Sequence, residues 1–265
     1  MNRIENVFKN KKPDDKLMSL FITAGYPELD STVDLILGFE KNGADMIELG
    51  MPFSDPLADG PTIQYSSEVA IKNGITMNKI FEMVKKVRQR SQIPIILMGY
   101  MNPVLRYGVD SFTKKAAEAG VDGLIIPDIP LEEDGIIKES AKSNDLNVIH
   151  LVAPNTSDER MKLADENSSG FVYCVSVTGV TGAREGEEVT RSVDRFISRV
   201  RKNINKNPVM VGFGIKSFGD AQDIASNADG FIVGSALIDT ITKHYPKDGW
   251  QSELFSFVHS LKFGK

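Results

Sequence analysis

The sequence contains few cysteines and histidines, and this shortage excludes several kinds of site. Cys174 is the only cysteine among 265 residues, so the chain can form no internal disulfide and no cysteine-based zinc site. The three histidines, His150, His244 and His259, show no metal-ligand spacing. We therefore expect no metal centre.

Long apolar runs and an excess of one charge are also lacking. The most apolar stretch, residues 93–101, is about half the length needed to cross a bilayer. Lysines and arginines number 31 against 36 aspartates and glutamates, which gives a net charge of −5 with no long run of either sign. The polar residues 1–16 lack the apolar core of a signal peptide. We expect a cytoplasmic protein that binds neither nucleic acid nor membrane.

Short runs of Val, Ile, Leu and Met recur along the chain, and most are apolar throughout. Such runs are typical of parallel strands buried on both faces. Segments of helical period separate them. The predicted strands cover residues 17–24, 46–50, 93–99, 123–127, 148–153, 170–176, 209–214 and 230–233. The predicted helices cover residues 31–42, 78–89, 110–119, 132–144, 158–167, 191–203 and 217–227.

Eight alternating strands favour a closed parallel barrel over an open doubly wound sheet. A weak internal sequence repeat supports the barrel. Three similar segments each lead into a predicted strand: GADMIELG (43–50), GVDGLIIPD (120–128) and NADGFIVGS (227–235). We expect an α/β fold, a single (β/α)8 TIM barrel over residues 1–265 with a short N-terminal extension. Long connections follow strands two (51–75) and six (177–189), and in this fold such loops carry the active site.

Glu48 lies inside the second predicted strand among apolar neighbours. Burial there raises the pKa of a carboxyl toward neutrality, which suits a general acid and base. The alternative is a structural Glu held by a Ser, Thr or Tyr of a neighbouring strand.

The loop that follows this strand holds Asp55 and Asp59 among three prolines, which stiffen it. Each Asp alone fits an ordinary turn, but Glu48 and Asp59 on one rim form a plausible acid–base pair.

Glycine-rich turns follow the last two predicted strands. Gly212, Gly214 and Lys216 come after strand seven, and Gly234 and Ser235 after strand eight. Barrels often bind phosphate with backbone amides of these two loops and a helix N-terminus. The alternative is glycine for tight barrel corners alone.

Other residues leave more than one interpretation open. The Gly-hinged segment 178–186 has the composition of a lid that closes over a substrate, or of a surface loop. Tyr100 and Tyr173, near the ends of strands three and six, fit either a flat pocket or the core. Asp128, at the end of strand four, is structural, catalytic or a contact to another chain. A Schiff-base lysine and a nucleophile elbow are not found in the strands.

Five motifs together resemble the tryptophan synthase alpha subunit family. They are ELGMPFSDPLADGPTIQ (48–64), PDIPLEE (127–133), GVTGAR (179–184), GFGI (212–215) and GSA (234–236). The likeness runs in order from about residue 15 to the C-terminus, and the first motif is the most specific.

The resemblance implies retro-aldol cleavage of indole-3-glycerol phosphate into indole and glyceraldehyde 3-phosphate. Glu48 matches the family's acid and base, and Asp59 matches the carboxylate that accepts the indole N–H. Tyr173 matches a tyrosine beside the substrate. The other substrate contacts implied are Gly182, Gly214, Gly234 and Ser235 for phosphate, Thr181 in the lid, and Phe21 and Tyr100 for indole. Gly212 is added as a substrate-binding candidate because it belongs to the glycine-rich turn after strand seven.

The resemblance also implies a partner. The family works with a beta subunit that carries pyridoxal phosphate, in an alpha2–beta2 assembly, so no cofactor is expected in this chain. The matching contact surface comprises Asp55, Asn102, Pro103, Asp128 and Pro130.

Two alternative functions remain open from the sequence. Another phosphate-binding barrel enzyme, such as an isomerase or epimerase, shares the glycine loops but has no need of the Asp59 loop. A regulatory subunit that mainly activates its partner needs neither Glu48 nor Asp59.

Overall fold

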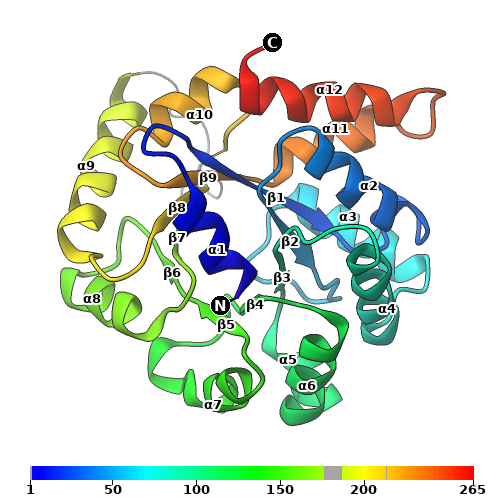
Figure 1. Ribbon diagram of the computed structural model, residues 1–265, viewed down its shortest axis with the longest axis horizontal. Coiled ribbons are helices and arrows are strands. Elements are labelled where there is room, and N and C mark those ends of the chain that lie inside the picture. Colours follow the sequence, from blue (N-terminus) through cyan, green and yellow to red (C-terminus); the bar gives the residue numbers. More distant parts are fainter. Residues whose placement is uncertain (1, 176–186, 213) are drawn as a thin grey trace.

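The strands form a parallel barrel surrounded by helices (Figure 1). The computed structural model describes residues 2–175, 187–212 and 214–265. The strands are β1 (Leu17–Thr23), β2 (Met46–Gly50), β3 (Ile95–Met98), β4 (Gly123–Ile125), β5 (Asn147–Ile149), β6 (Leu151–Val152), β7 (Val172–Val175), β8 (Val209–Gly212) and β9 (Gly230–Val233). The (β/α)8 prediction is confirmed, with one difference in the fifth strand.

The fifth predicted strand, residues 148–153, is two short strands that meet at His150. β5 pairs with β4, while β6 pairs with β7, so the two halves bond to different neighbours. The sheet order therefore starts at β5 and ends at β6, and the barrel closes where these strands are joined along the chain. The prediction of one continuous strand was wrong because periodicity does not show to which neighbour a residue bonds.

The helices cover the outside of the barrel. They are α1 (Arg3–Asn10), α2 (Ser31–Lys41), α3 (Pro61–Lys72), α4 (Met77–Arg88), α5 (Met101–Tyr107), α6 (Val109–Ala119), the 3-10 turn η1 (Leu131–Glu133), α7 (Gly135–Ser143), α8 (Asp158–Asn167), α9 (Glu187–Asn203), α10 (Phe218–Ile224), α11 (Ser235–His244) and α12 (Trp250–Phe263). No helix within the described ranges is long and apolar enough to span a membrane.

Helix α3 lies inside the connection 51–75, which the sequence prediction treated as one long loop. Gly60 precedes the helix in an extended conformation, and Pro61 occupies its first turn. Proline suits that position because its ring fixes a helical φ and the first amides have no partner in the helix. The irregular part of the connection is therefore the short segment that carries Asp55 and Asp59.

Two caps illustrate how local sequence sets helix starts. The Ser217 hydroxyl accepts a hydrogen bond from the amide of Asp220 at the start of α10. For α8 the cap is Ser157, whose hydroxyl accepts from the Arg160 amide, and not the preceding Thr156. The Thr156 hydroxyl accepts from the Ala153 amide instead.

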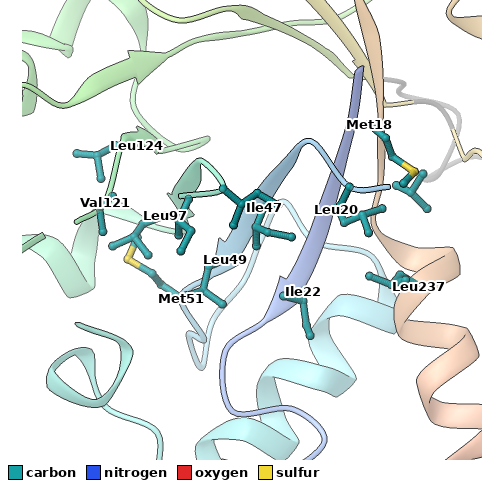
Figure 2. Packing of buried hydrophobic residues seen from close by; sticks show 14 of the residues in the cluster. Met18, Leu20, Ile22, Ile47, Leu49, Met51, Leu97, Val121, Leu124 and Leu237 are labelled. Atoms are coloured by element: carbon teal, nitrogen blue, oxygen red, sulfur yellow. The ribbon is translucent and has the colours of Figure 1, made fainter. Parts of the chain in front are cut away.

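Two apolar layers hold the barrel together. Alternate strand residues point outward and pack against the helices, among them Leu20, Ile22, Ile47, Leu49 and Leu97, which Figure 2 shows together with Leu237 on α11. All of these are completely buried, and each such side chain contributes roughly 1.5–3 kcal/mol of burial free energy. The other residues of each strand fill the barrel.

Helix α1 closes one end of the barrel and lies across the ring of strands in Figure 1. Its Ile4 is fully buried in the interior cluster, beside Leu17 and Met46 at the starts of β1 and β2. The Phe8 ring packs on Phe171, with centroids 6.0 Å apart. This plug fills the interior at the amino ends of the strands, so the inside of the barrel is closed at that end.

Candidate active site

A cavity of about 200 Å³ lies at the carboxyl ends of the strands. In parallel barrels this end carries the active site. Its lining combines aromatic and aliphatic side chains with a glycine-rich polar side. The lining residues are Phe21, Asp59, Ile63, Met98, Tyr173, Gly212, Gly214, Ile215, Lys216, Ile232, Gly234, Ser235, Ala236 and Asp239.

Glu48 lies in the barrel interior on β2, where it pairs in register with Phe21 of β1, a residue of the cavity wall. The carboxyl is fully buried. The Ser19 hydroxyl donates a hydrogen bond to Oε1 at 2.8 Å, whereas no group of the described residues donates to Oε2. Burial raises the pKa of Glu48 to about 7, and the Ser19 hydrogen bond opposes that rise. A serine of the neighbouring strand therefore holds one oxygen of Glu48, as the structural interpretation expects, and among the described residues the other oxygen has no hydrogen-bond partner.

Tyr173 on β7 packs against the interior cluster of the barrel, near Glu48. Burial, and then the nearby charge of Glu48, raise the pKa of its phenol well above the ordinary value. The side chain occupies space that Gly212 on β8 leaves open, since a Cβ at Gly212 would lie 2.7 Å from the Tyr173 hydroxyl. Tyr173 is therefore a neutral hydroxyl in the cavity wall.

Asp59 borders the cavity from the loop between β2 and α3. Burial raises the pKa of this half-buried carboxyl, and a hydrogen bond from the Tyr100 side chain lowers it. The Tyr100 oxygen also accepts a hydrogen bond from the Ala58 amide at 2.9 Å, and the Tyr100 ring packs on the Phe53 ring with centroids 5.4 Å apart. Tyr100 thus ties the Asp59 loop to the barrel.

The lining contributed by the loops after β8 and β9 suits an anion. Gly214 has a φ of 61°, a conformation that side chains rarely adopt. Gly234 precedes the ten-residue helix α11, whose N-terminus has no side-chain cap, and Ser235 begins the helix. Amides at a helix N-terminus carry positive partial charge, and Lys216 adds a full charge nearby. This side suits a phosphate.

The structure therefore brings together most of the predicted substrate residues. Glu48, Asp59, Tyr173, Phe21 and Tyr100 lie in or against the cavity and its extension toward β3, and Gly212, Gly214, Gly234 and Ser235 form its polar side. Thr181 and Gly182 lie outside the described residues. Sequence reasoning did not identify Ser19, Met98 or Ile232, although strand alternation through Phe21 and Glu48 could have placed Ser19 inside.

The predicted contact residues follow the carboxyl ends of β2, β3 and β4, with Asn102 and Pro103 in the first turn of α5 and the other three on loops. Asp55, Asn102 and Asp128 are exposed, as is Pro130, whereas Pro103 is half-buried. Asp128 also has a local role, because its carboxylate accepts from the Met101 amide at 3.0 and 3.2 Å and so caps α5. In the described ranges, acidic, histidine and cysteine side chains form no group that could hold a metal ion.

Comparison with known proteins decides the family. The family model described as tryptophan synthase alpha chain matches residues 8–259. The chain belongs to the tryptophan synthase alpha chain family. A relative from Geotalea daltonii is 48% identical over 268 residues, covering 100% of this chain and 99% of its own length. One from Thermoanaerobacter sp. (strain X514) is 46% identical over 263 residues, with 99% of both chains covered.

Solved structures of the tryptophan synthase family agree with the barrel. The tryptophan synthase alpha chain from Legionella pneumophila has a TM-score of 0.89 at 38% identity, covering 99% of this chain and 96% of that chain. Tryptophan synthase from M. tuberculosis gives a TM-score of 0.87 at 32% identity, covering 100% and 98%. Tryptophan synthase alpha chains catalyse the lyase reaction that cleaves indole-3-glycerol phosphate. The alternative function of an isomerase or epimerase is therefore not favoured by the family to which the chain belongs.

Proposed function

We propose that this chain cleaves indole-3-glycerol phosphate in the cavity, with Glu48 as the acid and base and Asp59 as the acceptor for the indole N–H. The observation that carries this assignment is the Glu48 carboxyl, which is completely buried, has its pKa raised to about 7 by that burial, and leaves Oε2 without a partner among residues 2–175, 187–212 and 214–265. A group with this pKa is present in both protonation states near neutral pH, as a proton shuttle requires.

The reaction starts from protonated Glu48. Its proton passes to carbon C3 of the indole ring, and the ring nitrogen takes up positive charge. The resulting carboxylate removes the proton from the hydroxyl on the adjacent glycerol carbon. The O–H electron pair forms the aldehyde, the carbon–carbon bond breaks, and its electrons restore the indole ring. Glu48 ends protonated, so no cofactor is consumed.

Asp59 serves the same step from the rim. A fixed carboxylate that accepts the ring N–H stabilises the positive charge as it develops. The Tyr100 hydrogen bond helps to keep Asp59 ionised, because it lowers a pKa that burial raises. In this proposal Glu48 has the role of the acid and Asp59 that of the anion.

The phosphate of the substrate is placed on the amides of Gly214, Gly234 and Ser235, with Lys216 beside them. Phe21 and Met98 offer apolar walls to the indole ring, and the Tyr173 hydroxyl lies next to Glu48. This arrangement anchors the substrate at its tail and leaves the reacting carbon near the carboxyls.

A partner and a location are included in the proposal. Asp55, Asn102, Pro103, Asp128 and Pro130 would contact a tryptophan synthase beta subunit in an alpha2–beta2 assembly, since they lie on the rim of the proposed site. The pyridoxal phosphate would be held by that subunit, and this chain would work in the cytoplasm without a cofactor of its own.

Release of indole from indole-3-glycerol phosphate tests the proposal, with and without the beta subunit. The Glu48→Gln variant keeps the size of the side chain but cannot carry the proton, so it is expected to bind substrate and lose turnover. Wild-type turnover by this variant would contradict the role of Glu48. Absence of cleavage by the unmodified pair of subunits would favour a different substrate, and activation of the partner without cleavage would favour a regulatory role.

A further inference from the structure

We infer that Ser19 is a positioning residue for Glu48: its hydroxyl holds Oε1 and thereby makes Oε2 the oxygen that exchanges protons with the substrate. The inference deepens the proposed function and rests on it for the role of Glu48. It assigns to β1 a part in the chemistry besides the Phe21 wall.

The position of Ser19 within the barrel is the first reason. It lies on β1 between Leu17 and Phe21, whose side chains also face the interior, and it is completely buried. A hydroxyl in such an apolar place is unfavourable unless it is hydrogen-bonded. Its donor is directed to Glu48 Oε1 at 2.8 Å.

The surroundings of Glu48 give the second reason. The interior residues of β3 are Ile96 and Met98, which have no groups that titrate. Tyr173 on β7 is the titratable neighbour, and Asp59 borders the cavity from the loop above. In the described part of the chain, Ser19 bonds to Oε1 and no donor reaches Oε2. One contact therefore fixes the plane of the carboxyl and distinguishes its two oxygens.

The direction of the effect follows from this contact. A hydrogen bond to the carboxylate favours the charged form and lowers the pKa of Glu48. A hydrogen bond to a charged acceptor is about twice as strong as one to a neutral acceptor. Removing the hydroxyl should therefore raise the midpoint of Glu48 titration by about one pH unit. Since the reaction starts from protonated Glu48, the decline of kcat/KM at high pH should move up by the same amount.

Loss of orientation has a separate signature. Without the Ser19 contact the carboxyl can rotate, so Oε2 spends less time facing the reacting carbon. We expect kcat on the pH plateau to fall about tenfold while KM changes less than about twofold, because the substrate contacts of the cavity remain.

The experiment compares Ser19→Ala, Ser19→Thr and a matched control in the full-length protein with its partner. Ser19→Thr retains the hydroxyl and is expected to restore the wild-type midpoint. Ser91→Ala is the control, since it removes a buried hydroxyl that accepts from the Ile93 amide at the opposite end of the barrel. Carbon NMR of the labelled Glu48 carboxyl gives the midpoint of Glu48 titration in the absence of substrate. The signal is assigned to Glu48 because it disappears in Glu48→Gln. Indole release across pH gives kcat and KM.

A raised NMR midpoint and a raised alkaline limb in Ser19→Ala, both absent from Ser91→Ala, are the expected result. An unmoved midpoint in Ser19→Ala overturns the inference, whatever the stability of the variant. Turnover by Glu48→Gln overturns the proposed function instead, and the NMR midpoint, which needs no turnover, keeps the two failures distinct.

Discussion

Replacing Glu48 by Gln should remove catalysis and at the same time stabilise the protein at alkaline pH. The carboxyl is completely buried, and in the part of the chain that the structure describes its one hydrogen bond is to Ser19. Above neutral pH the folded protein must hold it ionised in an apolar interior, which is unfavourable. A neutral amide of nearly the same shape avoids this penalty.

The size of the effect follows from the shift in pKa. The folded pKa of Glu48 is about 7, compared with an ordinary value of 4.5. The folded state therefore binds the proton more tightly than the unfolded state, and stability present below the ordinary pKa is lost as pH rises through the folded pKa. Each pH unit within this window corresponds to about 1.4 kcal/mol. Between about pH 5 and about pH 8, Glu48→Gln should gain about 2 to 3 kcal/mol in free energy of unfolding relative to the parent.

Urea unfolding of both proteins, followed by circular dichroism at several pH values, measures this difference. The comparison between pH values cancels any fixed effect of the amide on packing. Glu82→Gln, at an exposed position of α4, serves as the control and should show no such trend. A constant difference between Glu48→Gln and the parent across pH would refute the raised pKa on which the mechanism depends.

Three further perturbations test other parts of the site. Asp59→Asn should lower kcat about a hundredfold with little change in Tm, because a fixed anion at the rim is lost while the half-buried side chain keeps its size; steady-state indole release measures it. Tyr100→Phe should move the acid limb of kcat/KM to higher pH, since the Tyr100 hydrogen bond lowers the pKa of Asp59, and should weaken folding by about 1 kcal/mol because the Ala58 amide loses its partner. If the acid limb of kcat/KM does not move in Tyr100→Phe, ionisation of Asp59 is not what sets that limb. Gly212→Ala should raise KM about tenfold. Its methyl group would lie 2.7 Å from the Tyr173 hydroxyl and displace that ring toward the substrate. An unchanged KM would show that the Tyr173 ring moves aside without narrowing the cavity.

The sequence was informative where function depends on local pattern. Apolar strands alternating with helices predicted the barrel, and a lone carboxyl in such a strand predicted the buried Glu48 with a raised pKa. Glycines after the last two strands predicted the polar side of the cavity with Gly214 and Gly234. In each case the residue type and its place at a strand end are enough, because the fold puts all strand ends at one rim.

Features that depend on contacts between distant segments could not be predicted in the same way. Ser19 and Glu48 are 29 residues apart, and their contact needs the register of β1 on β2. The division of the fifth strand at His150 depends on which neighbour each half meets. Likewise, the polar segment before β1 gave no sign that Ile4 would fill the base of the barrel.

A crystal structure of the chain with an unreactive analogue, an indole joined through a short alkyl chain to a phosphate, tests the central claim most directly. We expect the phosphate at the N-terminus of α11, the ring N–H on Asp59, and Glu48 Oε2 within about 3.5 Å of ring carbon C3. An indole ring bound away from Glu48, or a phosphate bound elsewhere than Gly214, Gly234 and Ser235, would contradict the account.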